Sequence, residues 1–236
     1  MTDSELQRVS AYNIAQDLTG HTTEHLVSLP NGHFVHKDVA DPFSALQQAA
    51  GSAGFDLQLI SSFRAFDRQL AIWNGKFCGA RPVFDLYGAQ LDMNTLSDWD
   101  KCKAIMLFSA LPGTSRHHWG TDFDFYDHRS LPEDYSVQLV AQEYTEDGPF
   151  QGLTQWLIHH ARNYGFSFPY KSFRGGVAAE PWHISYHTLA NTFQKKLDHD
   201  TLWQILIEHD IEGKAALLQN IDFILENYIH NIHTIG

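Results

Sequence analysis

Two short polar clusters that lie far apart in the sequence constrain this chain more than any other feature. The first, residues 115–124, contains two adjacent histidines and two aspartates, and the second, residues 180–183, reads Glu-Pro-Trp-His. Imidazole and carboxylate groups are the usual ligands of catalytic zinc. A fold that brings the two clusters together would therefore hold one metal ion, and the rest of the chain should be the structure that supports it.

The size and charge of the chain exclude several classes of protein. A chain of 236 residues can bury a core without disulfides or a structural metal, so a metal here is expected to be catalytic. Acidic residues outnumber basic residues by 28 to 16, and the net charge of −12 leaves no basic stripe for nucleic acid. No apolar run is long enough for a membrane span.

The N-terminus and the cysteines bear on where the protein acts. Residues 1–5 lack the basic and apolar regions of a secretory signal, which predicts a cytoplasmic protein, with a periplasmic location as the alternative. Cys78 and Cys102 are too few and too dispersed for a zinc knuckle or a disulfide framework. Two free thiols are favoured over a single bridge.

Hydrophobic periodicity and turn residues predict alternating helices and short strands. Helical spacing covers residues 4–20, 41–51, 66–75, 97–109, 152–164 and most of 188–236. Strand patterns cover residues 55–61, 121–126, 166–168 and 184–186, and Asn-Gly predicts a hairpin over 27–35. Loops are predicted over residues 77–94 and 128–149.

This order of elements predicts an α+β fold with a small, mostly antiparallel sheet flanked by helices. We expect one zinc peptidase domain over residues 1–236, with a core over about 25–187. Residues 188–236 are predicted to be a helical C-terminal extension that caps the domain or makes a dimer contact.

The residue types in the two clusters predict three metal ligands. His117, Asp124 and His183 satisfy the rule of three protein ligands with a fourth position left for water. The chain must fold back at Gly120 to bring His117 over the strand that carries Asp124, and glycine permits that tight path. On composition alone, the alternative is a solvated turn with a buried, hydrogen-bonded carboxylate.

Two further residues are candidates for the chemistry itself. Pro181 biases Glu180 toward an extended backbone, so the second cluster is not a helical metalloprotease motif. A free carboxylate beside a zinc-activated water can act as general base, which is the role predicted for Glu180. Arg64 follows a predicted strand and could stabilise an oxyanion or bind a substrate carboxylate, the alternative being a structural ion pair.

Three motifs in order along the chain resemble those of a known family. Residues 115–124 and 180–183 are similar to the S-x-H-x-x-G-x-(A)-x-D and E-x-W-H motifs of the zinc D-alanyl-D-alanine carboxypeptidases, the VanY-like peptidases. Residues 62–69 are similar to the family's S-x-Y-R-S-x-x-x-Q segment, with Phe63 and Ala65 in place of tyrosine and serine. The resemblance covers about residues 55–187 and implies the fold of that family.

The resemblance also implies roles for individual residues. The positions that match the family's zinc ligands are His117, Asp124 and His183. Glu180 matches the catalytic base, and Arg64 matches the arginine that contacts the oxyanion or the substrate carboxylate. Gln69 and Ser115 match positions that line the substrate site or support the ligands.

Two positions in the first cluster leave alternatives open. His118 is adjacent to His117 and is the ligand most easily confused with it, although the motif favours His117. Asp122 replaces the family's usual small residue, and strand parity places it on the same side as Asp124. We expect it to be a hydrogen-bond partner of His117 or His118, the alternative being a competing ligand.

The implied function is removal of a C-terminal D-alanine from peptidoglycan stem peptides or their precursors, with Zn²⁺ as cofactor. An L,D-carboxypeptidase and a D-Ala-D-Ala dipeptidase are alternatives within the hydrolases, because they share ligands and differ in pocket shape. A zinc-stabilised peptide-binding module is the alternative outside the enzymes. Glu180 favours the enzyme, because a binding module has no use for a base at that position.

Overall fold

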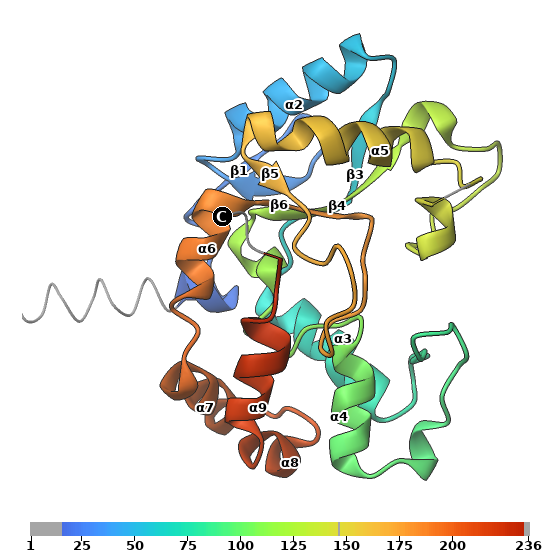
Figure 1. Cartoon of the computed structure of the whole chain (residues 1–236). Helices are drawn as coiled ribbons and strands as arrows, with labels where there is room; N and C mark the ends of the chain where they lie inside the picture. The colour runs from blue at the N-terminus through green and yellow to red at the C-terminus, as the bar shows by residue number, and fades with distance from the viewer. Residues whose placement is uncertain (1–15, 146, 234–236) are drawn as a thin grey trace, which may run out of the picture.

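The centre of the fold is a four-stranded antiparallel sheet, seen in the computed structural model, which describes residues 16–145 and 147–233 (Figure 1). Its strands lie in the order β3 (Leu57–Ser61), β4 (Asp122–Asp127), β6 (His183–Tyr186) and β5 (Phe166–Ser167). A separate hairpin pairs β1 (Leu26–Ser28) with β2 (Phe34–His36). The predicted α+β class and its small antiparallel sheet are confirmed.

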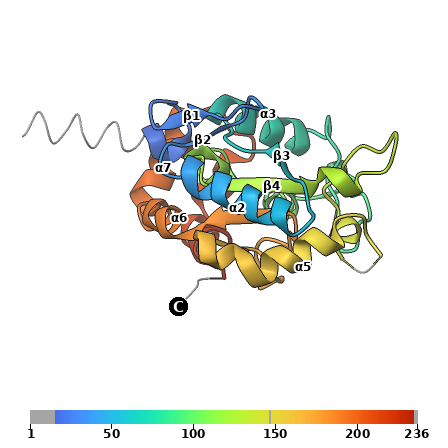
Figure 2. The ribbon, with the colours of Figure 1, turned by 90° about the horizontal axis from the view of Figure 1, so that it is seen from above.

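Two helices cover one face of the sheet, as the view from above shows (Figure 2). They are α2 (Ala40–Ser52) and α5 (Gln151–His160), and each presents an apolar stripe to the sheet. Phe123 and Phe125 of β4 point into this layer and share its core with Phe43 of α2 and Leu157 of α5. The alternate residues of β4 point to the opposite face, so the alternation predicted for this strand is confirmed.

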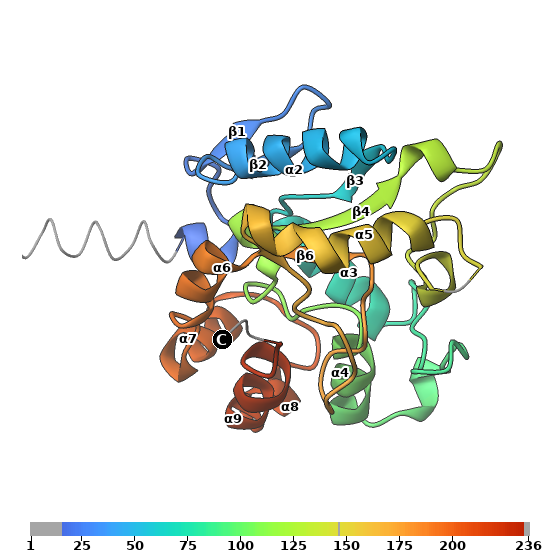
Figure 3. The same ribbon diagram turned by 45° about the horizontal axis from the view of Figure 1, so that its top comes forward.

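The remaining helices form a second layer on the other side of the sheet (Figures 1 and 3). They include α3 (Phe66–Phe77), α4 (Asp98–Met106), α6 (His187–Gln194), α7 (His199–Glu208), α8 (Lys214–Leu218), α9 (Ile221–Ile224) and a π-helical turn, η6 (Leu225–Ile229). Trp73 of α3 and Ile105 of α4 share one hydrophobic cluster with Leu206 and Leu217. The C-terminal helices are therefore built into the same core as α3 and α4.

Several element boundaries differ from the prediction. Helix α3 continues through Gly75 to Phe77, because the buried Phe77 ring outweighs the cost of about 1 kcal/mol for an internal glycine. Helix α2 runs from Ala40 to Ser52, one residue beyond the predicted range of 41–51 at each end. The predicted N-terminal helix falls largely on residues 1–15, outside the described residues, and residues 16–19 are helical.

Two further expectations concern cysteines and membrane spans. Cys78 is an exposed free thiol and Cys102 a buried one, which confirms the prediction of unbridged cysteines. Within residues 16–145 and 147–233, no helix combines the length and the apolar character needed to cross a membrane.

Candidate metal centre

Strand register brings the two polar clusters together. Asp124 of β4 is paired directly with His183 of β6. His117 arrives from η2 (Arg116–Trp119), a 3-10 turn that immediately precedes β4. One ligand atom from each of these three buried residues lies within 4.8 Å of the others. The cross-strand pair and the turn thus make one compact group from residues about sixty positions apart.

Gly120 makes the fold-back of His117 sterically accessible. Its φ of 65° is left-handed, and a Cβ at this position would lie 2.7 Å from the backbone nitrogen of His36. The Gly120 carbonyl accepts a hydrogen bond from that same nitrogen. The turn is therefore clamped against the β1–β2 hairpin, and only glycine fits there.

The protonation state of His117 suits metal binding. Its Nδ1 lies 2.9 Å from the carbonyl oxygen of Ser62 and donates to it. The free Nε2 faces Asp124, 3.5 Å from Oδ2. Burial lowers the pKa of His117 to about 4, despite the opposing charge of Asp124. The imidazole is accordingly neutral, with one lone pair directed at the group of ligands.

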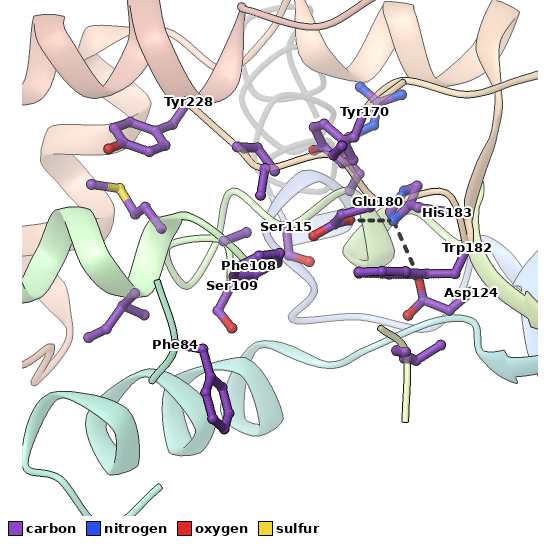
Figure 4. Close-up of a pocket in the computed structure, with 18 of the residues that line it drawn as sticks. Phe84, Phe108, Ser109, Ser115, Asp124, Tyr170, Glu180, Trp182, His183 and Tyr228 are labelled. Carbon is purple, nitrogen blue, oxygen red and sulfur yellow. Dashed lines mark ion pairs between the residues drawn. The ribbon is translucent and has the colours of Figure 1, made fainter. Parts of the chain in front are cut away.

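His183 is oriented by carboxylates on both ring nitrogens, and Figure 4 shows its ion pairs with Asp124 and Glu180. Nε2 lies 3.0 Å from Oδ1 of Asp122 and donates to it. Nδ1 lies 3.3 Å from Oδ1 of Asp124 and 3.4 Å from Oε2 of Glu180. Burial would lower the pKa of His183, but these carboxylates raise it well above its usual value. Nδ1 is thus the nitrogen that faces the centre.

An unsatisfied buried atom indicates that an ion fits this site. Oδ1 of Asp124 is buried and has no hydrogen-bond partner, although buried carboxylate oxygens are nearly always satisfied. A cation among Asp124, His117 and His183 would supply the missing interaction. Two imidazoles and one carboxylate, with a further position open toward a cavity, form a donor set suited to catalytic zinc.

His118 is excluded as a ligand by its hydrogen bonds. Its Nδ1 lies 2.6 Å from the carbonyl oxygen of Arg64, and its Nε2 accepts from the backbone nitrogen of Gly113 at 3.1 Å. Burial lowers the pKa of His118 to about 3. Both nitrogens are therefore occupied, and His118 anchors the backbone of Arg64 instead.

The expected partner of Asp122 was wrong. Asp122 contacts neither His117 nor His118 but accepts from His183 at 3.0 Å and from Nε of Arg116 at 2.7 Å. Burial would raise the pKa of this carboxyl, yet Arg116 and His183 hold it well below its usual range. The reason is register: Asp122 lies beside β6, whereas both histidines precede the strand. Asp122 therefore fixes the orientation of a ligand.

Glu180 occupies the position expected of a proton acceptor. Its carboxylate contacts Nδ1 of His183 and lines the same cavity as the three ligands. Burial raises the pKa of Glu180, and His183 opposes that shift. A buried carboxylate beside the open side of a metal centre can take a proton from a water and return it.

Arg64 reaches the cavity from the loop after β3. Its Nη1 donates to Oε1 of Gln69 at 2.9 Å and its Nη2 to Oγ of Ser61 at 3.1 Å. Burial lowers the pKa of Arg64, opposed by Asp124 and Glu180. Because both of its bonded partners are neutral, the guanidinium retains its charge for an incoming anionic group.

Gln69, which was predicted to line the substrate site or to support the ligands, is not among the residues that line the cavity. Its side chain is fully buried, and its Nε2 donates to the carbonyl oxygen of Ala110 at 2.6 Å while its Oε1 accepts from Arg64. The structure thus places Gln69 behind Arg64, where it positions the guanidinium. Ser115 does line the cavity beside the ligands, as its predicted role requires.

The ligands and Glu180 lie at one end of a cavity of about 900 Å³. In Figure 4, Asp124 and His183 lie on one side of it and Tyr228 on the other. The lining residues that the sequence analysis did not assign to the site include Lys76, Ser109, Tyr170 and Tyr228. Lys76 follows Gln69 by two helical turns, a spacing that could have revealed it. No sequence signal marked the other three.

Comparison with known proteins adds the following similarities. The sequence model of a family described as VanY, D-alanyl-D-alanine carboxypeptidase, matches residues 32–189. An uncharacterized protein of Haemophilus influenzae is 52% identical over 98 residues, which are 40% of this chain and 67% of the relative. A second uncharacterized protein of that organism is 33% identical over 121 residues, covering 50% and 92% respectively.

Among solved structures, VanYB in complex with D-alanine-D-alanine is similar in fold. It has a TM-score of 0.49 and 21% sequence identity, and the match covers 73% of this chain and 89% of that one.

Proposed function

The chain belongs to the VanY D-alanyl-D-alanine carboxypeptidase family, and we propose that it is a zinc-dependent carboxypeptidase that removes a C-terminal D-alanine from peptidoglycan stem peptides or their precursors. One observation carries the proposal beyond the family. The ligand atoms of His117, Asp124 and His183 lie within 4.8 Å of one another, and Oδ1 of Asp124 is buried there without a hydrogen bond, its contact with Nδ1 of His183 being 3.3 Å. Glu180 lies beside them, at the wall of a cavity large enough for a peptide end.

The metal ligands, Glu180 and Arg64 have separate roles in the proposed reaction. His117, Asp124 and His183 would hold the zinc, which would supply Lewis-acid chemistry at this site. Glu180 accepts the proton of the attacking water and passes it to the departing amine. Arg64 stabilises the negative charge that develops on the carbonyl oxygen, and Gln69 and Ser61 hold its guanidinium in place beforehand.

Asp122 and Arg116 serve the same reaction indirectly. The Arg116 guanidinium contacts Asp122, and Asp122 in turn holds Nε2 of His183. This chain of buried contacts keeps Nδ1 of His183 directed at the metal position. Carboxylate partners of this kind orient ligand histidines and raise their basicity.

Two other peptidase specificities are alternatives to the proposed D,D-carboxypeptidase. An L,D-carboxypeptidase or a D-Ala-D-Ala dipeptidase would use the same ligands and the same base with a differently shaped cavity. A zinc-stabilised peptide-binding module remains the alternative outside the enzymes. Glu180 supports the enzyme, because a module that only binds peptides has no use for a general base beside the metal centre.

The test is a panel of defined tri-, tetra- and pentapeptide stems and free D-Ala-D-Ala, incubated with the zinc-loaded protein. We expect D-alanine release from the peptides that end in D-Ala-D-Ala. Glu180→Gln should retain zinc and lose at least about 100-fold in turnover, since general-base catalysis is worth that much. The exposed Glu133→Gln is the matched control and should match the wild type. Zinc binding without release from any peptide would favour the binding module.

A further inference from the structure

Lys76 is a cation in the cavity that the proposed mechanism does not use. It lies near the end of α3 and lines the same cavity as Arg64, Ser115 and Glu180. Its Nζ donates to Oγ of Ser109 at 2.7 Å. An ammonium group carries three donors, so this bond leaves two of them unassigned. Nothing in the family motifs at residues 62–69, 115–124 or 180–183 includes this residue.

No carboxylate pairs directly with this ammonium, although the charge of Glu180 acts on it from a greater distance. Among the residues that the structure describes, neither Lys76 nor Arg64 has an acidic group within the 4 Å of an ion pair. The chain as a whole is strongly acidic, so acidic partners are abundant elsewhere. A half-buried cation without a direct ion-pair partner is unfavourable, and it is typical of a site that receives an anion from outside.

Lys76 is held next to the Arg64 assembly. Gln69, which accepts a hydrogen bond from Arg64, donates to the carbonyl oxygen of Ala110. Lys76 donates to Oγ of the adjacent residue, Ser109. Both contacts run from one face of α3 to one short segment, because residues 69 and 76 are two helical turns apart. Lys76 therefore lines the same cavity as Arg64, and Figure 4 shows its partner Ser109 on the side of Ser115 and Glu180 that faces away from Asp124.

A C-terminal peptide end presents two groups in that order. The carbonyl that is attacked belongs to the penultimate residue, and the free carboxylate follows it after a single residue, about 3.8 Å of chain. Arg64 would face the first group and Lys76 the second. Burial and the Arg64 charge both lower the pKa of Lys76, whereas Glu180 raises it, and a bound carboxylate would add to the effect of Glu180.

We propose that Lys76, positioned by Ser109, binds the C-terminal carboxylate of the substrate and makes the site selective for a peptide end. This inference rests on the proposed function and deepens it, because it assigns Arg64 to the developing oxyanion and Lys76 to the carboxylate. A peptide that continues past this point, or one that ends in an amide, lacks the negative charge that Lys76 recognises.

The test compares binding of N-acetyl-D-Ala-D-Ala and its C-terminal amide to zinc-loaded protein in the Glu180→Gln background, by calorimetry. Lys76→Met should weaken binding of the acid by about 10-fold to 100-fold, the range of a charge-assisted hydrogen bond, and leave binding of the amide unchanged. Lys76→Arg should restore most of the preference. Lys103→Met is the matched control, since it removes the same charge from a residue that pairs with Asp100 outside the cavity.

The outcomes separate this inference from the proposed function. Equal losses for acid and amide, or no loss for either, would overturn the role of Lys76 while turnover by the wild type continued to support the carboxypeptidase. If Lys76→Met selectively loses binding of the acid but the wild type shows no turnover, the carboxylate site is supported and the proposed carboxypeptidase activity is contradicted. With active wild type, Lys76→Met should raise KM for the acid and leave kcat within about twofold.

Discussion

Asp122 shows at the scale of one residue how far sequence reasoning reaches. Strand parity correctly placed its side chain on the face of Asp124. The choice of partner depends on which residue of β6 lies nearby, and register between strands far apart in sequence is not visible locally. For the same reason the role of Arg116 was not predicted: its guanidinium donates hydrogen bonds to Asp122, Ser185 and Gln194.

Asp122→Asn should weaken the metal centre. The amide can still accept from His183, but it no longer carries the charge that holds the ring and Arg116. We expect the zinc affinity to fall by about 10-fold to 100-fold, measured by competition with a chelator. Unfolding should also be followed, because an unpaired buried Arg116 destabilises by about 3–5 kcal/mol. Asp38→Asn, at an exposed carboxylate, is the control. Equal zinc affinities of the two variants would contradict a role for Asp122 in metal binding.

The two thiols should differ sharply in reactivity. Cys102 is fully buried, and burial raises its pKa to about 12. Only the thiolate reacts, and a solution at about pH 8 lies far below that value, so Cys102 stays protonated. A thiol reagent should modify Cys78 alone in the native protein and both residues in denaturant. Rapid modification of two thiols in the native state would contradict the packing of α4.

At the scale of elements, local sequence was sufficient wherever local interactions decide the structure. The hairpin at β1–β2, the helix α5 and the strand β4 were all predicted from patterns within a dozen residues, although α5 ends at His160 and a 3-10 turn, η5 (Ala161–Tyr164), follows it. The boundaries failed where packing outweighs propensity, as at Gly75, because the buried Phe77 lies in a core formed by distant helices. Tertiary burial routinely overrides a cost of about 1 kcal/mol.

Gly120→Ala should disrupt the turn that delivers His117. A Cβ there would meet the backbone of His36 at 2.7 Å, in addition to the cost of a left-handed φ. Gly32→Ala carries only the second cost, because its left-handed turn has open space around it. We expect Gly120→Ala to lower the free energy of unfolding by about 1–3 kcal/mol more than Gly32→Ala does, and to reduce zinc content. Equal losses in urea unfolding would show that the turn tolerates a side chain.

At the scale of the whole molecule, the C-terminal helices lay beyond sequence reasoning. Their helical character was predicted, and their place was left between a cap on the domain and a dimer contact, because nothing local marks which surface an amphipathic helix will cover. The structure packs them against α3 and α4 and puts Tyr228 and Ile224 in the cavity wall. Residues beyond the family match at 32–189 thus shape the space in which a substrate would bind.

Stability should therefore depend on these helices. Leu206 of α7 is fully buried in the core shared with α3, and the next residue, Ile207, is 43% exposed. Leu206→Ala should lower the free energy of unfolding by about 2–5 kcal/mol, and Ile207→Ala by much less. Urea unfolding followed by tryptophan fluorescence and circular dichroism should show one shared transition. A separate early transition for Leu206→Ala would indicate that the extension unfolds by itself.

The central claim is that His117, Asp124 and His183 hold a zinc ion on which peptide cleavage depends. The most direct test measures D-alanine release from a peptide ending in D-Ala-D-Ala before chelation, after complete metal removal, and after adding back about one zinc per chain. The account predicts that release stops on removal and returns on addition, with the metal-free protein still folded. Release that continues without metal, or that stays absent in the zinc-loaded protein, would contradict it.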